Sequence, residues 1–260
     1  MNTPKFPTLK ALCIALVLVC LLVVSPPAQA LEKTIVLGGP EGGWPPFFIQ
    51  GAEGQPARGI MADVLRAVAS RLGYAMAKAC YPEKRGMLYL REGDIDAWPK
   101  SVKWVDEPDN YLWTDPVLMS TDVLVFRASD PFPFRTIADL RGKSLGVIHG
   151  HVYPTLNRLF KQDITHRQKA ITVKNMLKML ERGHVDGAVC NRHVVEWILR
   201  TDNDLRADEF SFSDATVDSA PYGFAFTRKK GWKEFIPRFN RELLLMRRDG
   251  RLQAILSRYK

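Results

Sequence analysis

The feature that most constrains this chain is a repeated alternation of short β-branched segments with apolar stripes at helical spacing. Thr34–Gly38 has the composition of a strand, and apolar residues then recur at helical spacing between Ile60 and Leu72, directly before Gly73. The same order returns several times toward the C-terminus. Because two parallel strands need a crossover of about a dozen residues, usually a helix, this alternation predicts an α/β fold with parallel sheets.

The predicted elements are short and are separated by glycine or polar residues. The predicted strands are Thr34–Gly38, Tyr74–Cys80, Ile95–Trp98, Thr121–Phe126, Leu145–Ile148, Val185–Val189 and Phe224–Phe226. The predicted helical segments are residues 60–72, 85–92, 137–140, 173–180 and 194–199, and a largely helical end from Trp232 to Leu256 that is interrupted near Asp249-Gly250.

One internal echo bears on the number of lobes. The segment Leu90-Arg-Glu-Gly-Asp-Ile-Asp96 matches Leu180-Glu-Arg-Gly-His-Val-Asp186 in residue type. Both read as a helix end, a glycine cap, a polar residue and a buried strand. Many α/β units end their helices in this way, but the echo supports two similar lobes.

The first thirty residues have the three parts of a secretory signal peptide. Lys5 and Lys10 give a positive start, Ala11–Val24 is an almost unbroken apolar run, and Ala28-Gln29-Ala30 has the small-residue pattern of a cleavage site. The apolar run is shorter than the roughly 20 residues of a membrane-spanning helix. We therefore expect cleavage after Ala30 and a periplasmic protein. A membrane anchor and a lipid anchor on Cys20 are weaker alternatives.

Cleavage changes the charge and the cysteine content. The formal net charge of +9 loses the contributions of Lys5 and Lys10, and the remaining basic residues are scattered rather than gathered in an arm. Together with export, this excludes nucleic acid as a partner. Cys80 and Cys190 remain after cleavage, and two distant cysteines do not make a disulfide framework, so whether they pair is left open.

Several short motifs, taken in order, resemble the family-3 extracellular solute-binding proteins, which are the periplasmic receptors of polar amino-acid-type ABC importers. The motifs are Trp44-Pro-Pro-Phe47, Gly59-Ile-Met-Ala-Asp-Val-Leu65, Leu90 with Gly93-Asp-Ile-Asp96, Trp113-Thr-Asp115-Pro116, the segment 137–147, Arg182-Gly-His-Val-Asp186 and Arg248-Asp-Gly250. Each motif alone is weak, and their number and order carry the resemblance.

The resemblance implies a two-lobed α/β fold of the type II periplasmic-binding-protein kind, with a ligand cleft and two hinge crossings. Residues 31–126 with 221–260 would form lobe one, and residues 127–220 lobe two. The lobes would close on the ligand by hinge motion. The function implied is binding without chemistry or cofactor, followed by transient delivery to a membrane ABC permease. We expect a monomer that holds no metal.

Six candidate ligand contacts lie in lobe one. Trp44 and Phe47 sit in a proline-fixed loop, where a rigid aromatic face costs little entropy to order, although either ring could instead be core. Arg85 could present a guanidinium to an acidic ligand or be a surface cation. Three further residues follow the Ile95 strand, where the family places ligand contacts: Trp98, Lys100 and Ser101.

Lobe two supplies two further candidates. His151, in His149-Gly150-His151, follows a strand and opens a helix, where backbone N–H groups hold anions; the alternative is a solvent-facing histidine. Asn191 stands where the family has an aspartate that holds the amino group. The family's carboxylate-binding arginine is also missing, because the stretch Ser101–Asp109 contains no arginine. The resemblance therefore implies a ligand other than a standard zwitterionic α-amino acid.

Other functions remain open at this point. Some cyclohexadienyl dehydratases resemble these receptors, and Glu41, Asp115 and His151 are acid/base candidates, although their spacing does not assign an acid and a base. A metal site is a further alternative if His149-x-His151 and Cys190-x-x-His193 converge. A sensory module of the same fold is the last.

Overall fold

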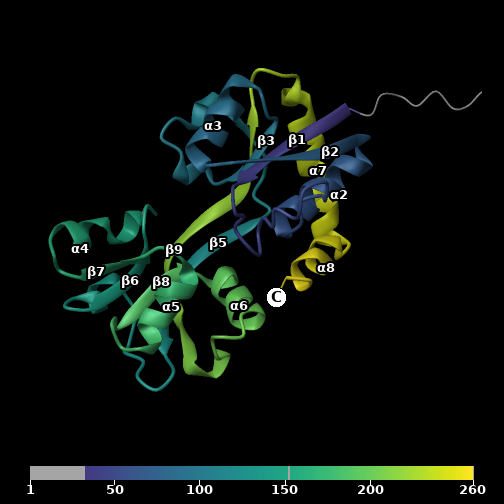
Figure 1. Cartoon of the computed structure of the whole chain (residues 1–260). Helices are drawn as coiled ribbons and strands as arrows, with labels where there is room; N and C mark the ends of the chain where they lie inside the picture. Colours follow the sequence, from purple (N-terminus) through teal and green to yellow (C-terminus); the bar gives the residue numbers. More distant parts are fainter. Residues whose placement is uncertain (1–32, 152, 260) are drawn as a thin grey trace, which may run out of the picture. The chain divides into compact units, whose positions relative to one another are not determined.

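A computed structural model describes residues 33–151 and 153–259. The predicted signal peptide and its cleavage site lie outside the described residues. The chain forms a mixed α/β structure in which strands and helices alternate (Figure 1). The alternation read from the sequence therefore corresponds to real elements.

The elements fall into two lobes joined by two long strands. The first lobe contains β1 (Lys33–Pro40), α2 (Ile60–Arg71), β2 (Tyr74–Tyr81), α3 (Glu83–Glu92), β3 (Ala97–Lys100), η1 (Val102–Trp104), η2 (Pro108–Asn110), β4 (Tyr111–Trp113), η6 (Trp232–Glu234), α7 (Phe235–Arg248) and α8 (Arg251–Ser257). The second lobe contains η3 (Ile137–Leu140), β6 (Ser144–Ile148), η4 (Pro154–Leu156), α4 (Asn157–Lys161), β7 (His166–Ala170), α5 (Val173–Glu181), β8 (Gly187–Asn191), α6 (Arg192–Thr201) and η5 (Ala207–Glu209). The joining strands are β5 (Leu118–Arg127) and β9 (Phe210–Thr227).

The joining strands are hydrogen-bonded to each other. The strand order is β2-β1-β3-β9-β5-β8-β6-β7, with β4 also paired to β9. β9 is antiparallel to β3 at its C-terminal end and antiparallel to β5 from Phe210 to Tyr222, with register shifts between Asp122 and Val125. The expected parallel pairing holds for β1 with β3 and for β6 with β7 and β8. Each antiparallel pair of named strands involves β5 or β9.

Three strand segments were not predicted from the sequence. β4 is only three residues long, Tyr111–Trp113. β7 reads His-Arg-Gln-Lys-Ala, and its first four residues are exposed because it is the last strand of the sheet. The predicted strand Phe224–Phe226 is only the end of β9, which begins at Phe210. Edge and crossing strands have few buried positions, so they lack the apolar run that marks a central strand.

The internal echo corresponds to the same backbone device in both lobes. Gly93 and Gly183 both have positive φ, 91° and 72°, and each follows a helix. The Asp96 amide donates to the Val36 carbonyl at 3.0 Å, and the Asp96 carboxylate accepts from the Val36 amide at 2.7 Å. Asp186 makes the same reciprocal pair with Ser144, at 2.8 and 2.7 Å. The echo thus marks equivalent positions in the two lobes.

The C-terminal end returns to the first lobe. The Tyr259 hydroxyl donates to Asp63 at 2.7 Å and accepts from the Gly59 amide at 2.9 Å, so it holds the start of α2. Behind this contact, aromatic side chains fill the core under η6 and α7, among them Trp232, Phe235 and Phe239.

Cys80 and Cys190 are both free thiols. Cys80 lies in β2 of the first lobe and Cys190 in β8 of the second. Across the part of the chain that the structure describes, no helix is long and apolar enough to cross a membrane.

Candidate binding site

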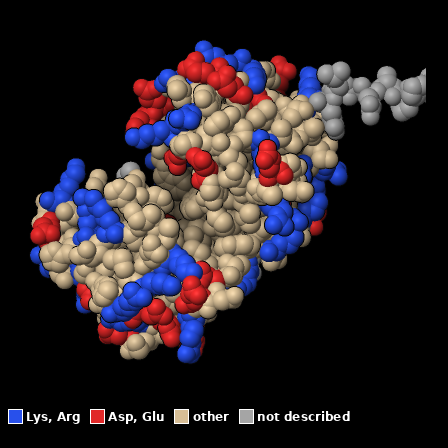
Figure 2. Space-filling view, viewed as in Figure 1, with Lys and Arg blue, Asp and Glu red and all other residues tan. Residues whose placement is uncertain are grey.

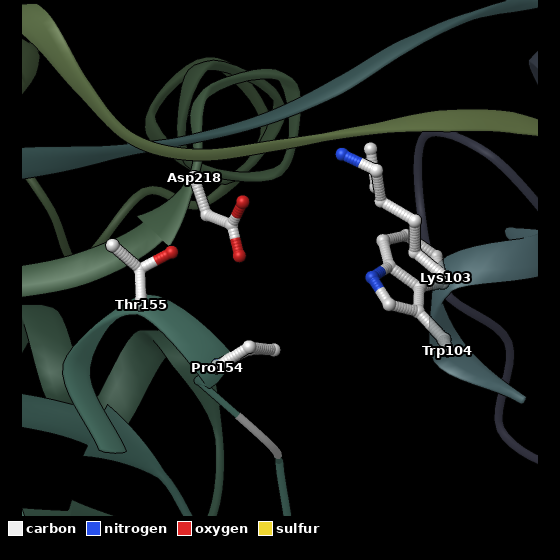
Figure 3. A pocket seen from close by; sticks show the side chains of 6 residues that line it. Lys103, Trp104, Pro154, Thr155 and Asp218 are labelled. Carbon is white, nitrogen blue, oxygen red and sulfur yellow. The ribbon is translucent and has the colours of Figure 1, made fainter. Parts of the chain in front are cut away.

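A cavity of about 320 Å³ lies between the lobes, where the surface is hollowed (Figure 2). Lys103 and Trp104 of η1 line it from the first lobe, and Thr155 at η4 lines it from the second. Asp218 and Ala220 of β9 line it from the crossing strand. Figure 3 shows the Trp104 ring and the Lys103 side chain on one side, and Asp218 and Thr155 on the other. Both lobes and one crossing therefore contribute to a single cavity.

Asp218 belongs to a row of polar side chains that crosses three strands. Asp122 on β5 is the register partner of Asp218 on β9 and of Asn191 on β8. Directly opposed residues of antiparallel strands place their side chains on the same face. Asn191, Asp122 and Asp218 therefore share one face of the sheet at the point where β5 and β9 leave the second lobe.

The environment of Asp122 disfavours its charge. Burial, and then the neighbouring Asp218 carboxylate, raises the pKa of Asp122 to about 6. Asp218 itself accepts a hydrogen bond from the Ser219 amide at 2.7 Å. Among the described residues, no lysine, arginine or histidine makes an ion pair with either carboxylate. Two adjacent, partly buried carboxylates without a paired cation disfavour each other's charge, and they mark this face as a candidate site.

Tyr153 also lies near this row. Its hydroxyl accepts a hydrogen bond from the Ile148 amide at 2.9 Å. Burial is the main reason that the pKa of Tyr153 lies above its usual value, and the Cys190 and Asp122 side chains add to the rise. The phenol therefore stays neutral and adds no charge to the second-lobe wall.

Interlocking rings form the first-lobe wall. The Trp44 ring lies 4.7 Å from Phe47, 5.6 Å from Tyr222 and 6.4 Å from Trp104, measured between centroids. Trp104 in turn lies 5.5 Å from Tyr222. Phe47 is fully buried and supports Trp44 from behind, whereas Trp104 is 36% exposed and faces the cavity. Packing against several rings holds Trp104 in place.

Lys100 lies beside the aromatic wall. Its ammonium group pairs with Glu83 of α3 and lies 5.8 Å from the centroid of the Trp104 ring. Such a distance allows a cation–π interaction. Lys100 is therefore already engaged within the first lobe.

Trp98 lies in the interior rather than on the cleft. It is 2% exposed and packs with Leu90, Ile95 and Tyr111. A Cβ atom on Gly86 of α3 would overlap the Trp98 ring, so that glycine permits the close approach of the helix. The physical reason is that side chains alternate along β3, and Trp98 points to the helix-covered face.

Ser101 and Asn191 both act in capping. Ser101 is fully buried, and its hydroxyl accepts from the Lys103 amide at 3.2 Å at the start of η1. The Asn191 side-chain oxygen accepts from the His193 and Val194 amides at 3.1 and 3.4 Å, and its amide nitrogen donates to Ser120 at 2.9 Å. Ser101 thus positions the two residues that line the cavity, and Asn191 ties α6 to the crossing strand β5.

His151 and Arg85 are both exposed. Desolvation by surrounding protein lowers the pKa of His151; Glu83 partly opposes the shift and Lys100 adds to it. His151 thus interacts electrostatically with Glu83 and Lys100, which both belong to the first lobe. Arg85 lies on the exposed side of α3, and no contact joins it to the cavity among the described residues.

Of the eight residues proposed from the sequence, none lines this cavity, although Ser101, Trp44, Lys100 and Asn191 contact residues that do or share a face with one. Sequence reasoning missed the six residues that line the cavity, which are Lys103, Trp104, Pro154, Thr155, Asp218 and Ala220. It also missed Asp122, the register partner of Asp218. Lys103 and Trp104 directly follow the predicted Lys100-Ser101. Asp218, Ala220 and Tyr222 recur at strand spacing, which was the available signal for a cleft-facing row.

Metal ligands do not gather in the described residues. Within residues 33–151 and 153–259, no group of three or more His, Cys, Asp or Glu side chains could hold a metal ion. The motifs His149-x-His151 and Cys190-x-x-His193 therefore do not converge there.

Comparison with known proteins decides the family. The model of the bacterial extracellular solute-binding proteins, family 3, matches residues 37–260. This chain is a family-3 extracellular solute-binding protein. The chain is 26% identical to the L-cystine-binding protein TcyJ of Escherichia coli (strain K12), over 88% of this chain and 83% of that protein. It is 24% identical to the L-cystine-binding protein TcyA of Bacillus subtilis (strain 168), over 89% and 83%.

Solved structures agree on the fold of this family-3 protein. The ligand-binding core of GluR0 in complex with L-glutamate has a TM-score of 0.68 at 20% identity, covering 89% of this chain and 99% of that one. An ancestral arginine-binding protein bound to arginine has a TM-score of 0.66 at 20% identity, covering 87% and 98%. At this identity the likeness concerns the two-lobed, periplasmic-binding-protein-like fold alone, which is the fold that the motifs implied.

Proposed function

We propose that this family-3 protein captures a small polar solute in the cavity between its lobes and delivers it to a membrane ABC importer from the periplasm. The observation that carries the proposal is the cavity of about 320 Å³, which receives side chains from the first lobe, the second lobe and β9. A solute held there would contact both lobes at once and so favour a closed arrangement. Family membership and the relatives named for L-cystine binding support the same function.

We further propose that the chain passes between the lobes at residues 118–121 and 219–222. β5 pairs with the second-lobe strand β8 from Asp122 onward, and β9 pairs with the first-lobe strand β3 from Gly223 onward. In this proposal the first boundary, expected after Phe126, moves toward the N-terminus. The two passages lie side by side as register partners, which suits a hinge.

The ligand, in our proposal, is not held as a standard α-amino acid is held in the family. Asn191 replaces the expected aspartate, and its side chain is engaged by the α6 amides and by Ser120. The stretch Ser101–Asp109 supplies Lys103 and Trp104 to the cavity instead of an arginine. The charges available to a ligand therefore differ in kind and place from the expected pair.

The proposal is tested by calorimetry of the purified mature protein against amino acids, L-cystine, amines, organic acids and small peptides. Micromolar or tighter binding of one class is the expected result. Trp104→Ala should weaken that binding by at least tenfold, whereas Leu88→Ala, an exposed residue of α3, should leave it unchanged. No binding across the panel would contradict the proposal.

A second candidate, an enzyme on this fold, is favoured by one observation. Asp122 has a pKa near 6 and stands beside Asp218, and carboxyl groups with raised pKa values serve as general acids. Turnover of prephenate or arogenate that is lost in Asp122→Asn would support it. Stoichiometric binding of a ligand that is recovered unchanged would favour the receptor.

A further inference from the structure

The cavity is asymmetric in charge. On the β9 side it presents the Asp218 carboxylate, and on the η1 side it presents the Trp104 ring and the Lys103 side chain (Figure 3). Asp122 lies beside Asp218 as its register partner. A solute in the cavity therefore meets the Asp218 carboxylate, which has a second carboxylate next to it on the same face of the sheet.

Among the described residues that line the cavity, Lys103 is the one cation, and it makes no ion pair with these carboxylates. The Lys103 ammonium group donates to the Ser219 carbonyl at 3.1 Å. Within the part of the chain that the structure describes, no ion pair joins Lys103 to Asp218 or Asp122. The negative charge at the cavity wall thus remains available to a ligand.

The opposite wall suits an apolar group. The Trp104 ring is the half-exposed member of the aromatic wall and lines the cavity. Lys100 already lies 5.8 Å from this ring, within range of a cation–π interaction, and Lys103 lies on the same side of the cavity, so the ring is a surface for the body of a solute rather than for its charge. A carboxylate facing an indole across a cavity is an arrangement that recognises a positively charged nitrogen attached to an apolar body.

We propose that the cavity receives the protonated amine of a solute, with the nitrogen against Asp218 and the body of the solute against Trp104. The inference rests on the proposed function and deepens it, because it assigns the chemical class of the ligand. Asp122 acts as a positioning residue that strengthens the negative field at Asp218. Thr155, which lines the same cavity, offers a hydroxyl oxygen as a further acceptor for the ammonium hydrogens.

Binding of an amine at this place depends on pH. Among the described residues, Asp218 on β9, Cys190 on β8 and Tyr153 from the loop before η4 interact electrostatically with Asp122, and none of these three is a cation. Below pH 6 Asp122 takes up a proton and the wall loses negative charge. The affinity for an amine should therefore fall as the pH is lowered from 7.5 to 5, whereas that for a neutral solute should not.

The test compares matched compounds by calorimetry at pH 7.5. One set is cystamine, N,N′-diacetylcystamine and 3,3′-dithiodipropionate, which share a disulfide skeleton; a second is tyramine, N-acetyltyramine and 3-(4-hydroxyphenyl)propionate. L-Cystine is measured beside them. We expect the amine of at least one set to bind tenfold or more tightly than its acetylated and acidic counterparts. Asp218→Asn should remove most of that preference.

Asp214→Asn is the matched control, because Asp214 is an exposed residue of the same strand. It should leave the affinity for the amine within twofold of the wild type. Tight binding of an acidic or acetylated compound, or an amine affinity that Asp218→Asn leaves unchanged, would overturn the inference while the proposed receptor function stands. A wild-type protein that binds no compound of either this set or the wider panel would contradict the receptor function itself, and the inference with it.

Discussion

The two walls of the cleft are made in different ways. On the first lobe, Trp104 and Trp44 rest on Tyr222 and on the fully buried Phe47, so packing fixes the shape of the wall. On the second lobe, Asp122 and Asp218 stand side by side without a paired cation, and burial disfavours the charge on Asp122. The first wall follows the rules of a stable core. The second departs from them, which is typical of sites that bind or react.

The largest expected effect concerns the core behind the first wall. Trp98→Ala would leave a cavity beside Gly86 and Gly38, which lie against the ring. We expect the free energy of unfolding to fall by about 3–5 kcal/mol, measured by urea unfolding followed by circular dichroism. Leu88→Ala, at an exposed position, should change it by less than about 0.5 kcal/mol. A Trp98→Ala protein as stable as the wild type would show that the ring is not a core element.

The next comparison uses the repeated aspartate device of the two lobes. Asp96 accepts hydrogen bonds from Lys230 at 2.7 Å and Trp232 at 3.1 Å besides its bond from Val36, whereas Asp186 accepts from Ser144. Each buried donor left without an acceptor costs about 1–3 kcal/mol. Asp96→Ala should therefore lower the free energy of unfolding by about 2–4 kcal/mol, and Asp186→Ala by about 1–2 kcal/mol. Equal losses in the free energy of unfolding for the two variants, measured by chemical denaturation, would contradict the expected difference between the two aspartates.

A substitution in the second wall should raise the free energy of unfolding instead of lowering it. The pKa of Asp122 is raised to about 6 in the folded protein, so the folded state favours the protonated form. Its contribution to stability is complete below pH 4 and is lost as the pH rises through 6. At pH 7.5, Asp122→Asn should therefore unfold at a higher urea concentration than the wild type, with a free energy of unfolding that is about 1–3 kcal/mol larger. At pH 4 the two proteins should differ little. A variant that is less stable than the wild type at pH 7.5 would contradict the raised pKa.

The smallest expected effect lies at the junction between α6 and β5. Asn191→Ala removes the side-chain oxygen that accepts from the His193 and Val194 amides. Loss of an N-cap costs about 1 kcal/mol, and Asn191→Ser, which keeps a neutral acceptor oxygen, should lose less of the cap. Thermal unfolding of both variants measures the difference. Equal destabilisation by Ala and Ser would indicate that the bond to Ser120, rather than the cap, is the important contact.

Patterning predicted the elements that bury one face. α2 and α5 carried apolar stripes at helical spacing, and β3, β6 and β8 were short apolar runs, so the α/β class could be read from the pattern. The two-lobed form was implied by the family resemblance and supported by the internal echo. β7 was missed because its exposed edge position leaves His166 to Lys169 polar. The first half of β9 was missed for the same reason, since a strand that passes between lobes has fewer buried positions than one inside a sheet.

The candidate site was harder to predict because it depends on register. Nothing local in the sequence indicates that Asp122 and Asp218 are partners; that follows from the antiparallel pairing of β5 and β9. The stretch after Lys100 was recognised as important, but attention fell on Ser101 and Trp98 rather than on Lys103 and Trp104. The first-lobe side chains that face the cavity are those of η1, whose start is capped by Ser101.

The return of the chain to its first lobe has a consequence for the order of assembly. In the proposed division of the chain, the second lobe is one continuous segment, whereas the first lobe also needs β9, α7 and the bond from Tyr259 to Asp63. During synthesis from the N-terminus, the first lobe therefore cannot be completed until the C-terminal segment has been made. We expect the middle segment to fold early and the outer segments to close last, so that the N-terminal strands stay unfolded until the C-terminal helix has arrived.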